Sequence, residues 1–476
     1  MDLPDGYVAF VKASCPTCQM MAPALIRLRE AGSPLTVYSQ DDPAFPDGAS
    51  PLDDSELRTS YEVGVEVVPT LLRVETGAVT DRLEGWLRTE WEGLTGVPEL
   101  GAGLPPYRAG CASRTLDPGM PEQLAIRYGG DKLRSRRVEV AELEDEFEAM
   151  FERGWADGLP VVPPTGERVL RMLEATRRDP QEVVAVVPPD LVECTVEKAA
   201  INAVMAGCRP EYLPVVLAAL EAACTSEFNI HGLLATTWSA GPVVIVNGPV
   251  AQRIGMNSGG NALGQGNRAN ATIGRALQLI VRNVGGGRPG GVDRATHGNP
   301  GKYTFCFAED EQGSPWEPLS VERGAPVGTS AVTLFAGSGV QPLVDQQSRT
   351  PESLARTFAT CLQVVAHPKL ALTWDAVLVV SPEHARVFRE AGWAKARLRE
   401  ELDGRLTRPG AEMVRGAGGI AEGMPPALAG ADVPKFRRGG LLIVHAGGTA
   451  GMFSAIIGGW ASGAVGSEPV TREVSE

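Results

Sequence analysis

The chain of 476 residues carries 44 lysines and arginines against 58 aspartates and glutamates, which gives a formal net charge of −14. This negative charge argues against binding to nucleic acid or to anionic membrane surfaces, because both attract basic proteins. With 43% hydrophobic and 21% charged residues, the composition is that of a globular protein of two to four domains.

The first motif along the chain is Cys15-Pro16-Thr17-Cys18, between the apolar run 7–11 and the apolar-periodic stretch 20–28. This order predicts a strand and then a helix whose N-terminus holds the first cysteine. Unpaired amides and the helix dipole favour a thiolate there, and the second sulfur is close enough to form a disulfide. The motif therefore predicts a dithiol–disulfide exchange site. The alternative is a structural zinc or an inert disulfide, although no second CxxC completes a zinc site.

A strand opened by a proline is expected at 67–72, followed by a hairpin turn at 75–78 and a second strand at 79–83. Together with the CxxC and with Pro23 in the following helix, these features make residues 1–98 resemble thioredoxin. The N-terminal part of the chain is therefore expected to be a thioredoxin-like domain.

The resemblance implies that Val68-Pro69-Thr70 carries a cis-proline facing the disulfide, so that Pro69 joins Cys15 and Cys18 in the catalytic set. Two positions depart from the family pattern: Ser14 stands where the family has tryptophan, and Ala9 where it has a buried acid. The acid assists proton transfer in thioredoxins, so these departures suggest a slower or more dedicated reductant.

Residues 99–138 are expected to be a linker, because glycine and proline recur through them, first at 101–106 and later at 118–119 and 129–130. Cys111 lies in this stretch. It is a catalytic candidate, since a thiol on mobile backbone could carry electrons between sites; the alternative is an incidental surface thiol.

The remaining residues, 139–476, alternate helical and strand patterns, which predicts a large α/β domain. Strands are expected at 183–187, 242–247, 303–307, 331–336, 376–380 and 441–445. Residues 237–249 and 373–382 each contain Thr-Trp, an apolar strand and a proline. This similarity indicates an internal repeat with halves at 139–345 and 346–476 and a site in the cleft between them.

The segment 257–275 is the densest group of candidate binding residues. Its glycines let backbone amides approach a ligand, and its asparagines supply donors and acceptors. An anion at the start of the helix that follows would also meet two arginines. The candidate substrate-binding residues are Asn257, Gly259, Gly260, Asn261, Asn267, Arg268, Asn270 and Arg275. The alternative is a structural Ω-loop, and neither a phosphate-loop nor a dinucleotide fingerprint fits.

Two further features are candidates for chemistry, whereas His384 and the remaining cysteines are expected to be structural. Cys306 could form a nucleophile–base pair with His297 or His231, although its flanking phenylalanines favour a buried structural cysteine. The loop 446–454 is expected to open a helix, where it could cradle an anion or simply be a tight turn. His384 is expected on a helix surface. The other cysteines, at 194, 208, 224 and 361, are expected in the core.

The stretches 157–165 and 267–276 resemble an uncharacterised bacterial α/β family of unknown activity, which assigns no roles. The fusion of a thioredoxin-like module to a large domain favours a thiol-dependent oxidoreductase, because a tether raises the effective concentration of the dithiol. Cys15 and Cys18 would supply electrons to a domain that acts on a small anionic substrate. The alternatives are a non-redox lyase or hydrolase whose catalytic thiol is kept reduced, and a non-enzymatic carrier of thiols or a soft metal.

The expected partners are a small-molecule substrate and a thioredoxin reductase, and self-association into a homo-oligomer is left open. No metal and no cofactor besides the redox-active disulfide Cys15–Cys18 is expected. We expect a cytoplasmic location, because no apolar run could span a bilayer, residues 1–5 do not resemble a signal peptide and the eight cysteines are spread as free thiols are.

Overall fold

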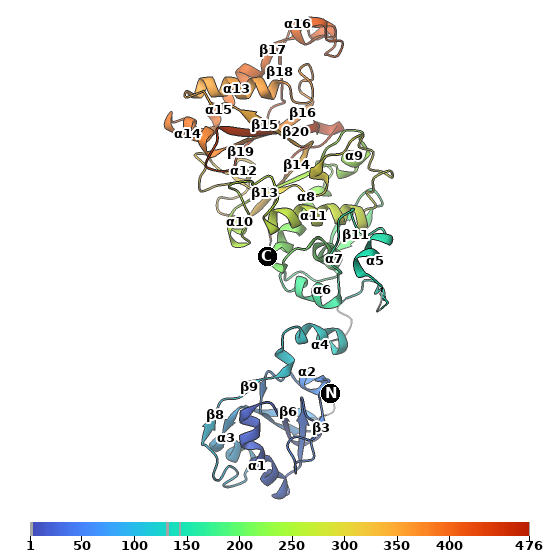
Figure 1. Cartoon of the computed structure of the whole chain (residues 1–476), viewed down its shortest axis with the longest axis vertical. Coiled ribbons are helices and arrows are strands. Elements are labelled where there is room, and N and C mark those ends of the chain that lie inside the picture. Colours follow the sequence, from blue (N-terminus) through green and yellow to red (C-terminus); the bar gives the residue numbers. More distant parts are fainter. Residues whose placement is uncertain (1–2, 130–132, 142–143, 476) are drawn as a thin grey trace. The chain divides into compact units, whose positions relative to one another are not determined.

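A computed structural model describes residues 3–129, 133–141 and 144–475. The chain folds as two compact units, Met1–Arg134 and Ser135–Glu476 (Figure 1). No helix in the described ranges is long and apolar enough to cross a membrane. Both units mix helices with sheets, in agreement with the predicted α/β class.

The first unit is built on a five-stranded sheet in the order β3-β2-β1-β5-β6. Its strands are β1 (Gly6–Val11), β2 (Leu35–Ser39), β3 (Leu52–Asp53), β5 (Thr70–Glu75) and β6 (Ala78–Glu84). The central strand β1 runs parallel to β2 and antiparallel to β5. Its helices are α1 (Pro16–Glu30), α2 (Arg58–Val63), α3 (Arg88–Thr95) and α4 (Met120–Tyr128).

Helix α1 packs on this sheet through one apolar stripe. Met21, Leu25 and Leu28 are fully buried in the same core as Val8 and Phe10 of β1. The spacing of four and three residues places the three side chains on one helix face. This packing fixes the start of α1, and with it the CxxC motif, at the end of the central strand.

The structure differs from the linker predicted for residues 99–138, because most of this stretch folds back onto the first unit. Strand β8 (Tyr107–Arg108) pairs with β7 (Trp86–Leu87), and β9 (Cys111–Ala112) pairs with β4 (Val67–Val68). The boundary between the units lies after Arg134 instead. Glycines and prolines here shape the turns of a folded segment and do not mark a free connector.

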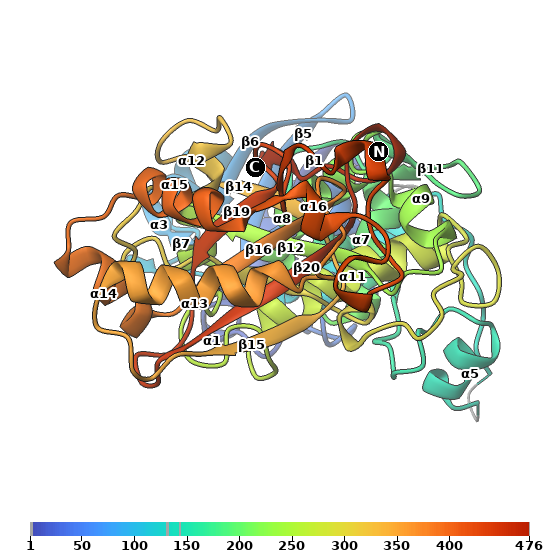
Figure 2. The same cartoon turned by 90° about the horizontal axis from the view of Figure 1, so that it is seen from above.

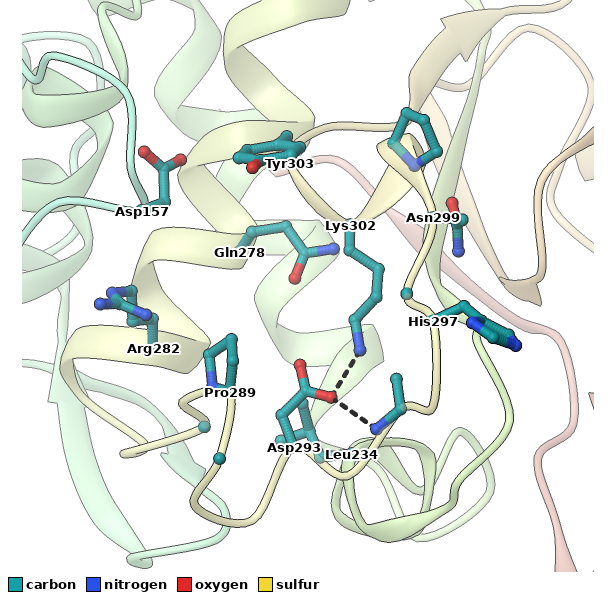
Figure 3. Close-up of a pocket in the computed structure, with 15 residues that line it drawn as sticks. Asp157, Leu234, Gln278, Arg282, Pro289, Asp293, His297, Asn299, Lys302 and Tyr303 are labelled. Atoms are coloured by element: carbon teal, nitrogen blue, oxygen red, sulfur yellow. Dashed lines mark hydrogen bonds and ion pairs between the residues drawn. The ribbon is translucent and has the colours of Figure 1, made fainter.

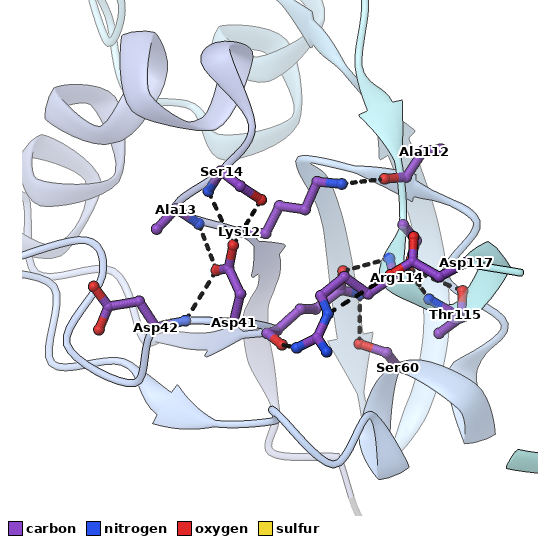
Figure 4. A network of polar contacts seen from close by, with 12 residues as sticks. Lys12, Ala13, Ser14, Asp41, Asp42, Ser60, Ala112, Arg114, Thr115 and Asp117 are labelled. Atoms are coloured by element: carbon purple, nitrogen blue, oxygen red, sulfur yellow. Dashed lines mark hydrogen bonds and ion pairs between the residues drawn. The ribbon is translucent and has the colours of Figure 1, made fainter. Parts of the chain in front are cut away.

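A buried polar network ties this returning segment to the sheet (Figure 4). The Gln40 amide donates to the hydroxyls of Ser60 and Ser113, at 2.9 and 2.8 Å, and its carbonyl accepts from the Arg114 amide at 3.1 Å. Thr115 Oγ1 also donates to the backbone oxygen of Val65 at 2.6 Å. Because Gln40 is fully buried, leaving these groups unpaired would be costly, and the network holds the segment in place.

The second unit contains two four-stranded sheets. The first has the order β13-β12-β14-β21, with β12 (Gly241–Asn247), β13 (Cys306–Ala308), β14 (Ala331–Gly337) and β21 (Val470–Glu473). The second has the order β15-β20-β16-β19, with β15 (Val340–Val344), β16 (Trp374–Val380), β19 (Leu441–His445) and β20 (Phe453–Ala461).

The two sheets stack face to face. Val377 and Val379 of β16 share one core with Val243 and Ile245 of β12, whereas Leu378 points into a core on the other face. This alternation is the period of a strand that is buried on both sides. The outer layers are helices. Helices α8 (Leu213–Ala223) and α11 (Arg268–Asn283) cover the first sheet, and α7 (Val196–Ala206) packs on α11. Helices α13 (Pro351–Gln363), α14 (Pro382–Glu390) and α15 (Lys395–Leu406) cover the second sheet (Figure 2).

Both sheets show the same succession of pairings. Counted from β13 or from β19, each has one parallel pair followed by two antiparallel pairs. The fourth strand is exchanged: β15 follows β14 in the chain but pairs with β20, and β21 follows β20 but pairs with β14. The predicted halves, 139–345 and 346–476, therefore each donate an edge strand to the sheet of the other.

Most predicted strands of this unit agree with the structure within two residues, but two predictions are wrong in detail. The strand expected at 303–307 begins only at Cys306, because 300–302 form a turn of 3-10 helix. The loop 446–454 leads into strand β20 and not into a helix, and the burial of Ser454 and Ile456 on either side of the half-buried Ala455 fits that strand. The remaining elements are α5 (Glu146–Glu152), α6 (Gly166–Leu173), β10 (Val183–Val187), β11 (Val192–Thr195), α9 (Ile230–Ala235), α10 (Pro249–Arg253), α12 (Leu319–Glu322), β17 (Thr407–Pro409), α16 (Gly410–Met413) and β18 (Asp432–Pro434).

The boundary after Arg134 predicts where a protease acts first. Arg134, Arg136 and Arg137 are exposed and lie outside helices and strands, so limited trypsin digestion should cut there and leave two resistant fragments. Mass spectrometry of the early products identifies the ends. Early cleavage after Arg108 or Arg114 would contradict the folded state of the returning segment.

Candidate functional site

The thiol site of the first unit forms where β1 leads into α1. Cys15 is the N-cap residue of α1, and its sulfur accepts a hydrogen bond from the Cys18 amide at 3.4 Å. The same sulfur lies 3.6 Å from the carbonyl oxygen of Val68, directly before Pro69, and the Val68–Pro69 peptide is cis. The structure thus brings together Cys15, Cys18 and Pro69, three of the four residues predicted for catalysis in this unit.

The two sulfurs of the motif have opposite acidities. The hydrogen bond from the Cys18 side chain, with further support from Cys111 and from the amides of Cys18 and Thr17, outweighs burial and lowers the pKa of Cys15 to about 5. Burial, together with the hydrogen bond to Cys15, raises the pKa of Cys18 far above its ordinary value. One cysteine is therefore a thiolate at neutral pH and the other holds its proton, the division that thiol–disulfide exchange requires.

Cys111 belongs to the same site. It is the β-bridge partner of Val68, and its side chain is in hydrogen-bonding contact with that of Cys15. Burial, and then the hydrogen bond to Cys15, raises the pKa of the Cys111 thiol. The residue that we expected on a mobile linker therefore lies fixed beside the thiolate.

In the second unit, the asparagine-rich segment uses most of its amides to hold its own backbone. Asn267 caps α11 by accepting from the Asn270 amide at 3.0 Å. Asn270 in turn donates to Asn257 O at 2.8 Å and accepts from its amide at 3.1 Å. Asn257 Oδ1 accepts from the Gly259 amide, Asn257 Nδ2 donates to Gly260 O, and Asn261 Nδ2 donates to Gln265 O. These contacts agree with the structural Ω-loop that was the alternative interpretation.

The two arginines predicted for anion binding in this segment are occupied as well. Arg275 forms a bidentate ion pair with Asp157, with distances of 2.9 and 2.8 Å, and both side chains are only 13% exposed. Arg268 donates to the Gly207 carbonyl at 2.9 Å. The structure does not assemble the predicted anion site at the start of α11, because long-range partners take up the charge of Arg275 and a donor of Arg268.

A cavity of about 530 Å³ lies along a different part of α11 (Figure 3). Gln278 and Arg282 line it from the helix, where a spacing of four residues puts both on one face. The glycine-rich segments on either side of β-bridge residue Asp293 complete the wall, and His297, Lys302 and Tyr303 also line it. Within these segments the sequence pointed only to His297, as a candidate base for Cys306.

The two carboxylates that line this cavity, Asp157 and Asp293, are paired with Arg275 and Lys302, which leaves one cation of the lining without an ion-pair partner among the described residues. Arg282 makes no hydrogen bond or ion pair with any residue that the structure describes, and its Nε atom and Gln278 Nε2 are buried without partners. Lys302, by contrast, is neutralised by Asp293 at 2.7 Å. Burial and the nearby charge of Arg288 lower the pKa of Arg282, but an arginine stays protonated. A fork of unpaired donors in a concave site is suited to a carboxylate or a similar planar anion.

A second cavity, of about 390 Å³, is bordered by residues 261–264 and by the loop 446–451. Ser454 lines it, and its hydroxyl lies 2.7 Å from Nδ1 of His384, whose Nε2 is 3.0 Å from the backbone oxygen of Asp345. A carbonyl can only accept, so Nε2 carries the proton and Ser454 donates to Nδ1.

Burial lowers the pKa of His384. His384 is fully buried, so its predicted surface position is wrong: α14 turns this face toward β20.

No cysteine of the second unit hydrogen-bonds to a histidine within the part of the chain that the structure describes. Cys306 is buried in β13, and burial raises the pKa of its thiol and that of Cys208, the latter to about 12. Within the described residues neither His297 nor His231 hydrogen-bonds to Cys306, so the predicted nucleophile–base pair is not assembled. All eight cysteines are free thiols. Among the residues that the structure describes, there is no group of three or more His, Cys, Asp or Glu side chains that could hold a metal ion.

Comparisons with protein-family models, with curated proteins and with solved structures find no match to the chain. Two places in the molecule offer chemistry: the thiols around Cys15, where the pKa of one sulfur is lowered, and the cavity at Arg282, a cation with no hydrogen-bond partner among the described residues. The first can exchange disulfides, and the second can hold an anion.

The acidity of Cys15 is directly measurable. Ultraviolet thiolate absorbance should titrate with a midpoint near pH 5, and the midpoint should rise in Cys18→Ala, because that substitution removes the largest stabilising hydrogen bond. The folded-state pKa lies below the ordinary value of about 9. The thiolate therefore stabilises the fold most above that pH, and this contribution declines as the pH falls toward 5. A Cys15→Ser protein that kept both the low-pH titration and this pH dependence of unfolding would contradict the assignment.

Proposed function

We propose that the protein is a thiol-dependent oxidoreductase. In this proposal the first unit is a thioredoxin-like exchange module, and the larger unit binds a small anionic substrate to which the electrons are delivered. The supporting observation is the Cys15 thiolate at the N-terminus of α1 beside a Cys18 that keeps its proton. A cytoplasmic location and a thioredoxin reductase as electron donor belong to the same proposal.

The thioredoxin-like assignment is supported by how the parts of the site are connected. The CxxC follows the central strand β1, whose neighbours are a parallel β2 and an antiparallel β5, and a hairpin joins β5 to β6. Pro69 opens β5 opposite the motif. The returning segment with β8 and β9 is an addition to that arrangement, and it supplies the third thiol.

An internal repeat in the larger unit is also part of the proposal. Its support is the common order of pairings in the two sheets. In each half a threonine side chain caps a helix upstream of the strand that follows Thr-Trp: Thr350 caps α13, directly before β16, and Thr195 caps α7, which α8 and α9 separate from β12. Duplication of one helix–strand unit, with exchange of the last strand, would produce this arrangement.

We place the substrate in the cavity at Arg282, and no longer at residues 257–275. A carboxylate there could accept from the guanidinium of Arg282 and from the side-chain amide of Gln278, since Arg282 Nε and Gln278 Nε2 have no partner in the described ranges. His297 and Tyr303, which also line the cavity, could exchange a proton with the bound molecule. These features supply binding and proton transfer, while the electrons come from the dithiol.

One observation favours the non-redox alternative, a hydrolase. Ser454 donates to a neutral, buried His384 at the edge of the smaller cavity, which is the arrangement of a nucleophile and its general base. Turnover of an ester that survives Cys15→Ser and is lost in Ser454→Ala would select this alternative.

Exchange activity tests the main proposal. The protein should reduce an aromatic disulfide in the presence of dithiothreitol, and Cys15→Ser should lower the rate at least about a hundredfold. Oxidised without dithiothreitol, Cys18→Ser should be trapped with Cys15 in a disulfide, because no second thiol of the motif can release it. Cys361→Ser is the matched control, because Cys361 is a half-buried cysteine of the other unit. Wild-type turnover in Cys15→Ser would overturn the proposal.

Ligand binding tests the cavity. Malonate and succinate serve as probes, and at saturating concentration they should raise the melting temperature, because a ligand that binds only the folded state stabilises it. Arg282→Gln should weaken binding by about tenfold or more through loss of a charge-assisted hydrogen bond. Arg268→Gln, on the same helix but bonded to Gly207, should bind as the wild type does. Equal binding by all three proteins would exclude Arg282 from the site.

A further inference from the structure

The side chain of Cys15 is shielded from solvent, although its low pKa is typical of a thiol that attacks disulfides. Both Cys15 and Cys18 are 0% exposed, whereas Cys111 is half-buried. An external disulfide therefore meets Cys111 before it can reach the thiolate. In a site built from the CxxC alone, the low-pKa sulfur would need its own access to solvent.

The cover over Cys15 is an ordered strand. Thr17 Oγ1 donates to Ala109 O and Lys12 Nζ donates to Ala112 O, each at 2.7 Å, so both ends of the segment 109–112 are fastened. Gly110 lies so close to β4 that a Cβ there would collide with the Val67 side chain and lie 3.0 Å from Val68 O. This close approach brings the Cys111 side chain to that of Cys15.

We propose that Cys111 is a third redox thiol, which exchanges with the external disulfide and passes its oxidation to Cys15 through a Cys15–Cys111 disulfide. This role rests on the proposed exchange function, and it deepens that function by naming the thiol that meets the substrate. This role differs from the mobile electron carrier expected from the sequence, because hydrogen bonds hold both ends of the segment around Cys111 beside Cys15.

The exchange balances over three steps. First, Cys111 attacks one sulfur of the external disulfide R–S–S–R′, its proton moves to the Cys15 thiolate, and R′–S⁻ leaves. Second, Cys15 attacks the Cys111 sulfur, which breaks the mixed disulfide, and its proton goes to the departing thiol R–SH. Third, Cys18 attacks the Cys15 sulfur, and its proton returns to Cys111. The net change is a two-electron oxidation of Cys15 and Cys18 to a disulfide and reduction of one external disulfide to two thiols.

The intermediate can be trapped in the full-length chain. In Cys18→Ser the third step is blocked, so oxidation with 2-hydroxyethyl disulfide should yield a Cys15–Cys111 disulfide, which peptide mass spectrometry under non-reducing conditions identifies. A mixed disulfide between Cys15 and the probe, with Cys111 still open to alkylation, would overturn the relay. The Cys15–Cys18 disulfide of the oxidised wild type would still form in that case, so the exchange function itself would stand.

Rates give a second readout that does not depend on trapping. Cys111→Ser should slow oxidation of the dithiol by 2-hydroxyethyl disulfide at least about tenfold, while Cys361→Ser leaves the rate unchanged. A wild-type rate in Cys111→Ser would overturn the relay. If Cys111→Ser unfolds, as its melting curve would show, the trapping result decides, since that experiment leaves Cys111 in place.

Discussion

The capping of α1 by the sulfur of Cys15 is the contact on which the thiol chemistry depends. A helix N-terminus has unpaired amides, and here the ligand that meets them is a side chain of the CxxC motif itself. The apolar stripe of α1 fixes the helix against the central strand. The Gln40 network then fixes the returning strand next to the same sulfur. The low pKa of Cys15, its burial and its proximity to Cys111 follow from the cap, the packing of α1 and the position of the returning strand.

In the larger unit the main constraint is that two stacked sheets must both be buried. Alternate residues of β16 and β19 face a helical layer or the partner sheet, so nearly every position in those strands is apolar. Polar groups collect where strands end and in the loops. The cavity at Arg282 illustrates this division: α11 packs its apolar residues on the sheet, and its polar residues Gln278 and Arg282 remain to line a pocket.

The sequence predicted features that depend on neighbours in the chain. The helix start at the CxxC and most strands of the larger unit need only local patterns. Features set by distant partners could not be predicted this way. Arg275 is neutralised by Asp157, 118 residues away, and His384 is buried by β20, 70 residues ahead. The return of Cys111 to Cys15 likewise required a strand that glycine and proline content had suggested was a linker.

The exchange of edge strands has a consequence for synthesis of the chain. Strand β14, at 331–337, is completed only by 470–473 of β21, so its backbone edge has no partner until well over a hundred further residues have been made. An open edge of this kind is a template for pairing with other chains. Nascent molecules of this protein are therefore expected to need protection from one another during translation, and to lose that need in a single late event, when β21 docks and the first sheet is complete.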